Sequence, residues 1–524
     1  MSHSLPPNHF LSLPRQHVSH LGVVPDTSTL AAHDFDVDVR TGFMPPSPPL
    51  SRLPPTYAIW EQLLDDISTK RFKLGERKDL NERDRNASET WRRKVQQMPI
   101  LPITELSQSE VMLRRAHHVL AFILHTYIHS LPPSADATAP IYIPAPLSIP
   151  LLEISADLVI PPILTYSDNV LYNWELSTSE ATQDFPNHID LMQLRTQTTF
   201  TGTPDEEHFY LTSSRIELVG VTALALLRSI EDEAFVGDFL SLQRISHYLS
   251  QLVGVIDEMT VTLNDVRHGC DPAVFYEKIR PWFCGQDSRP WVFEGATKAN
   301  LQEPTELSGP SAGQSSIIHV LDIFLGVDQF SHTHVPGGTT TTPAPPPPPP
   351  PLSSSSSSSS NSSHVVAVEK QSPFLERMQV YMPRHHRAFL NHLKQSPRSL
   401  RAIVMTPPPS FSPSDGSVCN GFSPEEVEVR KDLKVAYNAS VMALKRFRDA
   451  HIRIATLYII SQARKAQHES EALQQPNMDS GSIVLSQGSS DANSDTMQCK
   501  GTGGTDLVPF LKGVRDRTAA AVIR

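Results

Sequence analysis

Cysteine is scarce in this chain, and the few cysteines are far apart. The 524 residues include only Cys270, Cys284, Cys419 and Cys499, and no two of them form a CxxC pair. This spacing excludes a disulfide framework and a zinc ribbon, and it favours a reducing compartment.

Long apolar runs and a surplus of positive charge are also missing. The longest apolar run, LVGVTALALL at 218–227, is about half of the ~20 residues that a bilayer span needs. The first residues, MSHSLPPNHFLSLP, lack the basic and apolar regions of a secretion signal. The 45 basic and 56 acidic residues give a net charge of -11, which offers no broad attraction for nucleic acid or an anionic membrane. We therefore expect a cytosolic protein with a small molecule or a protein as its partner.

Proline is abundant instead, and its distribution divides the chain. The 46 prolines cluster in the first 55 residues and at 345–351, where TTTTPAPPPPPPPLSSSSSSSSNSS cannot form a packed core. We expect 1–55 to be a disordered extension, with low-complexity insertions at 332–372 and 466–500.

The remaining chain carries mainly helical patterns. The proline-rich stretch APIYIPAPLSIPLLE, from residue 139, predicts irregular or short-stranded structure before the chain turns helical, and it marks a plausible domain junction. The sequence thus predicts an all-α protein, with a small, mainly helical N-terminal domain at 56–180 and a large helical domain at 181–524.

One long helix contains an unusual inward-facing residue. At 3.6 residues per turn, one stripe holds Leu433, Tyr437, Val441, Leu444, Arg448, His451, Ala455 and Tyr458. Ser423 suits the N-cap, Pro424 the first helical position, and Glu426 closes a capping box. A run to about Arg464 would be on the order of 60 Å long. His451 is either a core histidine satisfied by a carbonyl or a metal ligand, and the stripe alone leaves both open.

Several other motifs have weaker chemical meaning. GPSAGQSS at 309–316 lacks the lysine of a P-loop, and neither it nor KGTGGTDL at 500–507 follows a clear strand, so both favour loops that approach a flat ligand closely. His125 and His129 lie one turn apart but lack the glutamate of HExxH and a third ligand. The adjacent His385 and His386 favour a solvated or structural role.

FYEKIRPWF places an arginine beside aromatic side chains. Arg280 would stand at the edge of a surface formed by Phe275 and Ile279, and an arginine fork binds a carboxylate with two hydrogen bonds. An exposed pairing with Glu277 on the same helix is an equal alternative.

Taken together, these stretches resemble the indoleamine 2,3-dioxygenase family, monomeric haem enzymes that open the indole ring of tryptophan. The resemblance covers roughly 57–520, and its pieces occur in the family's order: IPAPLSIPLLEISADLVIPPILTYSDNVLYNW, DEEHFYLTSSRIE, FYEKIRPWFCG, WVFEGA, GPSAGQSSIIHVLDIFLG, FLERMQVYMPRHHRAFL, RFRDAHIRIATLYI and GTGGTDLVPFLK. The long N-terminal tail and the insertions lie outside it and look like additions of a fungal member.

The resemblance implies roles for named residues. His451 would be the proximal ligand of a non-covalent haem b, consistent with the absence of a CxxCH motif, and Asp322 with Arg448 would orient that ligand. Phe209 and Phe275 would pack the indole, and Arg280 would bind the substrate carboxylate. The full set of implied substrate-pocket positions is Tyr166, Val170, Phe209, Ser213, Phe275, Arg280, Ser311, Ala312, Thr502 and Gly503.

The implied reaction is cleavage of the indole C2–C3 bond of L-tryptophan by O2 to give N-formylkynurenine. This is the first step of the kynurenine pathway towards NAD, and it needs no acid–base pair on the protein. Two alternatives are a haem-binding sensor or low-activity paralogue, and a cofactor-free helical scaffold whose residues 345–351 bind an SH3- or WW-type domain. Pro310 and Asn169 depart from the family pattern in the pocket.

Overall fold

The computed structural model describes residues 35–177, 191–286, 289–330, 374–396, 398–406, 424–474 and 507–524. These residues are mostly helical, which confirms the all-α class. Strands within them form only two small sheets: β1 (Ile141–Ile143) pairs in parallel with β4 (Trp291–Phe293), and β2 (Glu175–Leu176) pairs antiparallel with β3 (Leu194–Arg195).

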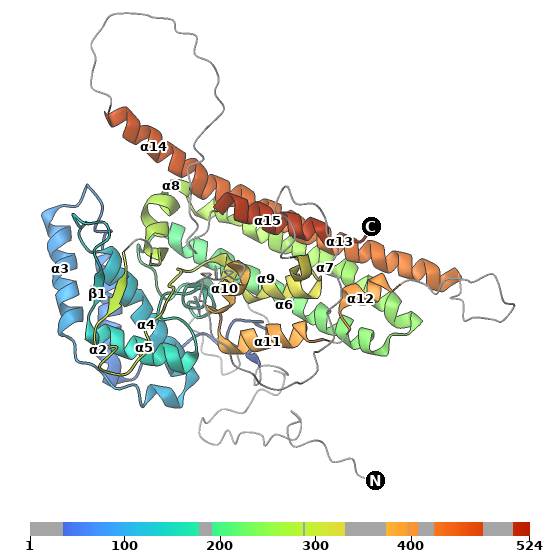
Figure 1. The fold of residues 1–524 in the computed structure, drawn as a ribbon, viewed down its shortest axis with the longest axis horizontal. Coiled ribbons are helices and arrows are strands. Elements are labelled where there is room, and N and C mark those ends of the chain that lie inside the picture. Colours follow the sequence, from blue (N-terminus) through green and yellow to red (C-terminus); the bar gives the residue numbers. More distant parts are fainter. Residues whose placement is uncertain are drawn as a thin grey trace, which may run out of the picture.

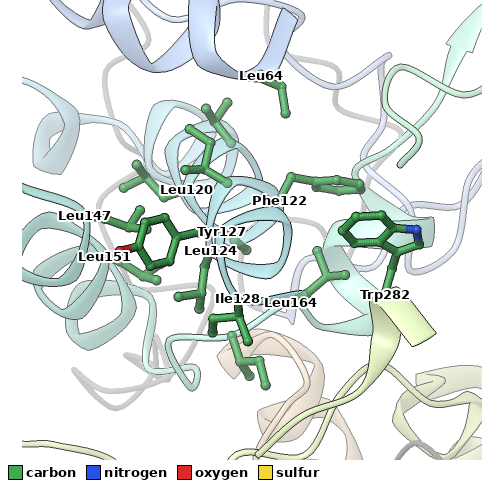
Figure 2. Packing of buried hydrophobic residues seen from close by; sticks show 14 of the residues in the cluster. Leu64, Leu120, Phe122, Leu124, Tyr127, Ile128, Leu147, Leu151, Leu164 and Trp282 are labelled. Carbon is green, nitrogen blue, oxygen red and sulfur yellow. The ribbon is translucent and has the colours of Figure 1, made fainter. Parts of the chain in front are cut away.

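The first helical group packs around α4 (Glu110–His129). Ser109 caps this helix by accepting a hydrogen bond from the Met112 amide, and nearly all of its residues are buried. Leu120, Phe122, Leu124 and Tyr127 point from it in different directions into the surrounding side chains (Figure 2). The helices around it are α2 (Ala58–Lys70), α3 (Glu82–Gln97) and α5 (Ala145–Leu158), with short 3-10 turns at η2 (Pro55–Tyr57) and η3 (Leu106–Gln108).

The proline-rich stretch is more helical than its composition predicts. It forms the expected short strand, β1, but α5 begins only two residues later and includes Pro150. Pro146 lies in the first turn, where a missing amide hydrogen is tolerated, whereas Pro150 lies in the helix interior and removes one helical hydrogen bond. Burial of Leu147, Leu151 and Ile154 outweighs this loss.

Three long helices form the second group. The hairpin of α6 (Pro204–Val236) and α7 (Phe239–Gly269) turns at Gly237, whose φ of +70° is the left-handed conformation that glycine adopts easily. The third helix, α13 (Pro424–Ala455), packs along α7. By length and composition α6 could cross a membrane, but 61% of its most apolar window is buried inside the protein, as in a core helix.

Shorter elements complete this group. On α13 lies α15 (Leu507–Ala520), and α9 (Ser316–Phe324) packs against α11 (Arg384–Lys394) (Figure 1). The other elements are η4 (Ser167–Leu171), α8 (Pro272–Val274), η5 (Phe275–Ile279), η6 (Arg280–Phe283), η7 (Ala312–Gln314), η8 (Asp328–Phe330), α10 (Phe374–Gln379) and α12 (Leu400–Met405).

The helix that carries His451 follows its predicted course. It begins at Pro424, although the predicted N-cap Ser423 lies outside the described residues, and it continues through a π turn, η9 (Thr456–Ile460), into α14 (Ser461–Gln474). The whole rod crosses the molecule in Figure 1. The predicted stripe is buried except at His451, which is half-buried.

The two groups share apolar contacts. The core around α4 also takes in Trp282, Phe283 and Tyr458 from later segments of the chain. A domain boundary near residue 180 therefore stays a prediction.

Candidate functional site

His451 faces an apolar cavity near the centre of the described structure. It lines two cavities of about 190 Å³ each, which share Tyr166, Phe209, Ala312 and other wall residues. Within the described residues its imidazole forms no hydrogen bond or ion pair. Burial, with a smaller contribution from the charge of Arg448, lowers the pKa of His451 to about 4, so the ring is neutral and has a free lone pair at neutral pH. This is the state in which histidine binds a metal.

A buried ion pair lies one helical turn before His451. Nη2 of Arg448 donates to both carboxylate oxygens of Asp322 on α9, at 2.5 and 2.6 Å, and Nη1 donates to the hydroxyl of Thr518 on α15. Three helices are thus joined directly behind His451. Because both charges are buried and mutually compensated, the arrangement restricts where this part of α13 can lie.

Aromatic rings form one wall of the same cavity. The ring centroids of Phe209 on α6 and Phe275 on η5 are 4.6 Å apart, and Tyr458 contacts Phe275 edge-on at 5.6 Å. The Tyr458 hydroxyl donates to the carbonyl of Cys270 at 2.5 Å, which fixes the ring. A flat aromatic ligand can pack against such a wall.

Arg280 directly follows the turn that carries Phe275, and it lines the same cavity. Its guanidinium carbon lies 5.8 Å from the centroid of the Tyr276 ring. Between the described side chains of Arg280 and Glu277 no ion pair forms. The half-buried guanidinium stands where a carboxylate in the cavity can reach it.

The pair His125 and His129 positions the segment that carries Arg280. His125 Nδ1 donates to the carbonyl of Trp282 at 2.6 Å, and His129 Nε2 donates to that of Cys284 at 2.9 Å. Burial lowers their pKa values to about 3 and about 4, so both rings stay neutral. Their i, i+4 spacing showed that they share a face of α4, but the sequence did not reveal this anchoring role.

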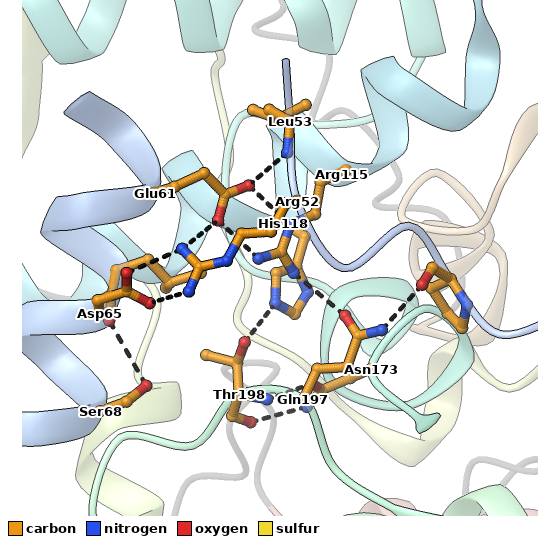
Figure 3. A network of polar contacts seen from close by, with 12 residues as sticks. Arg52, Leu53, Glu61, Asp65, Ser68, Arg115, His118, Asn173, Gln197 and Thr198 are labelled. Carbon is orange, nitrogen blue, oxygen red and sulfur yellow. Dashed lines mark hydrogen bonds and ion pairs between the residues drawn. The ribbon is translucent and has the colours of Figure 1, made fainter. Parts of the chain in front are cut away.

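The π turn η4 carries Asn169 and Val170 on another wall. Asp168 in this turn bonds to the side chains of His117, at 2.8 Å, and Thr165, at 2.8 Å. A second network holds the segment that follows η4. The Asn173 side chain donates to the Thr198 carbonyl and accepts from the Thr198 amide, and the Thr198 hydroxyl bonds to His118 (Figure 3).

A buried carboxyl group behind the cavity was not found from the sequence. The Tyr166 hydroxyl donates to Oε1 of Glu217 at 2.9 Å, and the Ser315 hydroxyl donates to the same oxygen at 2.6 Å. Glu217 is only 1% exposed, and burial raises its pKa to about 7. A single inward glutamate on α6 offers no sequence signal, because its partners lie 51 and 98 residues away.

The loop before α9 approaches the cavity closely. Ser311 accepts a hydrogen bond from the Gly313 amide at 3.2 Å, and the small Ala312 side chain is exposed to the open space. A Cβ on Gly313 would lie 3.1 Å from Phe374 and 3.3 Å from Met378, so a glycine here lets the loop pack closely against these two side chains. The loop is joined to the η4 wall because Gln314 Oε1 accepts a hydrogen bond from the Tyr166 amide at 2.8 Å.

The structure therefore brings most of the sequence-derived site together. One cavity is lined by Tyr166, Val170, Phe209, Ser213, Phe275, Arg280, Ser311, Ala312 and His451. Asp322 and Arg448 stand behind His451, whereas Thr502 and Gly503 lie outside the described residues. In the described part of the chain, no group of three His, Cys, Asp or Glu side chains could hold a metal ion.

Comparison with known proteins identifies relatives along almost the whole chain. The family model described as indoleamine 2,3-dioxygenase matches residues 31–521. The indoleamine 2,3-dioxygenase of Saccharomyces cerevisiae is 31% identical, with 93% of this chain and 92% of the relative covered. Indoleamine 2,3-dioxygenase 2 of Homo sapiens is 26% identical, covering 94% and 96%, and indoleamine 2,3-dioxygenase acdA of Aspergillus candidus is 26% identical, covering 94% and 98%.

Proposed function

The chain belongs to the indoleamine 2,3-dioxygenase family, and from this premise we propose that it uses haem and O2 to cleave the indole C2–C3 bond of L-tryptophan. The product is N-formylkynurenine, as the first step of the kynurenine pathway towards NAD. The observation that carries the proposal is His451, a neutral imidazole without a partner among the described residues, facing an apolar cavity that also has an aromatic wall and Arg280.

The residues of the cavity fit a haem. His451 would hold the iron, the small side chain of Ala312 would leave room for a flat macrocycle, and the apolar walls would cover its faces. When bound, haem supplies the iron at which dioxygen is activated. The protein contributes by fixing the ligand: Asp322 and Arg448 lock the turn of α13 before His451, and this limits its rotation and displacement.

The same cavity fits the substrate. Phe209 and Phe275 would pack together against one side of the indole and exclude water there, because their rings are in contact, with centroids 4.6 Å apart, and their surroundings are apolar. Arg280 would bind the carboxylate of the amino acid, and the contacts of Trp282 and Cys284 with α4 hold its segment in place. These contacts orient the substrate, so that binding energy is used to position the reacting bond.

An absorption spectrum together with a turnover assay tests the proposal. The purified protein should show a Soret band that shifts with L-tryptophan, and the reduced protein should form N-formylkynurenine under O2. A Soret band without turnover would indicate the haem-sensor alternative, and the absence of a band after haem addition would indicate a cofactor-free scaffold. Arg280 argues against both, because neither needs a carboxylate site beside an aromatic wall.

Three further features are proposals with less support. The charge balance and the spacing of the cysteines favour a cytosolic location, and the family resemblance favours a monomer. The run at 345–351, outside the described residues, would be the contact for an SH3- or WW-type domain.

A further inference from the structure

All three π turns in the described part of the chain line the cavity that His451 faces. η4 contributes Val170, η5 contributes Phe275, and η9 contributes Tyr458. A π turn interrupts the regular hydrogen bonding of a helix, and such turns occur often at functional sites. The last of them, η9, continues the helix that carries His451, and it brings Tyr458 to the cavity wall.

The hydroxyl of Tyr458 attaches this helix to the end of α7. It donates to the carbonyl of Cys270 at 2.5 Å, and it lies 3.2 Å from the carbonyl of Val266. Cys270 follows the last residue of α7, and carbonyls at the end of a helix lack a partner within that helix. Tyr458 and Cys270 are each only 2% exposed, so loss of the hydroxyl would leave a buried carbonyl without this bond.

The chain after Cys270 leads directly to the substrate side of the cavity. Asp271 caps the next turn by accepting hydrogen bonds from two backbone amides, and its carbonyl accepts from the amide of Phe275 at 2.9 Å. From Phe275 the chain passes through η5 into η6, which begins at Arg280. The hydroxyl of Tyr458 therefore holds the beginning of the segment on which both substrate-binding side chains stand.

The two ends of this segment are held by different helices. Helix α4 holds the end after Arg280, through the carbonyls of Trp282 and Cys284, and Tyr458 holds the beginning. Of these anchors, Tyr458 is the one on the helix that carries His451.

The aromatic ring of Tyr458 adds a second contact with the same segment. It meets the Phe275 ring edge-on, with centroids 5.6 Å apart, and η9 also packs on α8. Tyr458 stands seven residues after His451 on one continuous helix, on the order of 10 Å away at 1.5 Å per residue. One side chain thus connects the imidazole that faces the cavity to the segment that would bind the substrate.

We propose that Tyr458 is a positioning residue for the reaction: its hydroxyl sets the place of the substrate-binding segment, residues 275–280, relative to His451. Phe275 and Arg280 belong to one continuous segment, so they keep their relative positions when it shifts. Loss of the hydroxyl therefore leaves substrate binding nearly intact but misplaces the bound indole, and small misplacements cost large factors in rate. This inference rests on the proposed function, because it concerns the same cavity and the same substrate contacts.

Two matched variants test the role of the hydroxyl. Tyr458→Phe removes it and keeps the ring in the cavity wall. Tyr437→Phe is the control, because Tyr437 lies on the same helix and donates to the carbonyl of Leu325 at 2.7 Å, outside the described lining of both cavities. Each variant loses a hydroxyl that bonds to a carbonyl, so both should lower the urea midpoint of the protein.

Only Tyr458→Phe should alter the reaction. We expect its kcat for tryptophan to fall by about tenfold or more, while the calorimetric Kd for tryptophan in the haem-loaded protein changes by less than about threefold and haem content stays normal. Tyr437→Phe should keep kcat within about twofold of the wild type. Equal kcat values in the two variants, or a loss confined to KM, would overturn the inference.

Amide hydrogen exchange of the purified protein without substrate gives a readout that does not depend on turnover. In Tyr458→Phe the amides of residues 271–280 should exchange about tenfold faster, because the segment opens more often without its hydroxyl bond. Tyr437→Phe should leave these rates near the wild-type values. Unchanged exchange in Tyr458→Phe, or an equal rise in both variants, would show that the hydroxyl does not hold the segment.

These outcomes separate the inference from the proposed function. If the wild type cleaves tryptophan and Tyr458→Phe does so with the same kcat, only the inference about Tyr458 fails. If the wild type cleaves no indole, both fail, and hydrogen exchange still reports whether the hydroxyl holds the segment.

Discussion

A single guanidinium nitrogen of Arg448 bonds to both carboxylate oxygens of Asp322, one helical turn before the half-buried imidazole of His451. The two residues lie 126 positions apart in the chain. Their contact joins α9 to α13 at the cavity. Both charged side chains are buried, and each is neutralised mainly by the other. The ion pair therefore stabilises the fold and also fixes the position of the ligand.

Breaking this pair should be costly. Asp322→Ala leaves the Arg448 charge buried and uncompensated, which we expect to lower the free energy of unfolding by about 3–5 kcal/mol and to weaken haem retention. Asp257→Ala is the matched control. It breaks an exposed ion pair between Asp257 on α7 and Arg446, which lies on α13 like Arg448, and it should change the free energy of unfolding by less than about 1 kcal/mol. Urea denaturation measures both. Equal effects would show that the buried pair has no special role.

Removing the imidazole should separate haem binding from folding. His451→Ala should abolish stable haem binding while helical content, measured by circular dichroism, stays near the wild-type value, because the stripe of α13 remains buried. His247→Ala, an exposed histidine on α7, should retain normal haem occupancy. Normal occupancy and activity in His451→Ala would instead show that another residue is the ligand.

Arg280→Ala tests the carboxylate site. Haem spectra should remain near normal, but kcat/KM for tryptophan should fall by roughly 30- to 1000-fold, since a charge-assisted pair in an apolar pocket contributes on the order of 2–4 kcal/mol. Tryptamine, which lacks the carboxylate, should lose far less. Arg280→Lys should recover only part of the activity, because an ammonium group lacks the planar fork. A matched loss for both substrates would mean that Arg280 shapes the pocket without binding the carboxylate.

Glu217 should give the protein a measurable pH dependence of stability. Its pKa is about 7 in the fold and 4.5 in its unperturbed state, so between these values the unfolded chain releases a proton that the folded chain keeps. Its contribution is fully present below about pH 4.5, falls by about 3 kcal/mol as pH rises to 7, and is constant above that. Glu217→Gln lacks this titration, so its stability relative to wild type should rise over the same window. A constant difference from pH 4.5 to 7 would contradict the assignment.

The proline- and serine-rich insertion should be dispensable for catalysis. Deleting residues 338–364, which lie outside the described residues, should change kcat/KM by less than about threefold, because the cost of closing a loop changes slowly with its length. Haem content and steady-state kinetics check this. A tenfold fall in turnover or a loss of haem would show that the segment takes part in the fold.

The sequence alone determined the helical class and the buried stripe of α13, on which His451 faces inward. These features depend on local periodicity, because 3.6 residues per turn place Arg448 and His451 on the face that carries Leu444. The order of motifs along the chain was specific enough to indicate the family. The proline-rich stretch misled only about where α5 begins, since apolar burial outweighed the preference of proline for irregular structure.

Only the tertiary structure decided which buried polar groups meet. It showed that His125 and His129 anchor the Arg280 segment, that Glu217 binds Tyr166 and Ser315, and that the Asn169 carboxamide has no partner among the described residues. No periodicity encodes such contacts, because each joins segments tens to more than a hundred residues apart. Their geometry follows from how the helices pack, and a hydrogen bond exists only where packing brings donor and acceptor within about 3 Å.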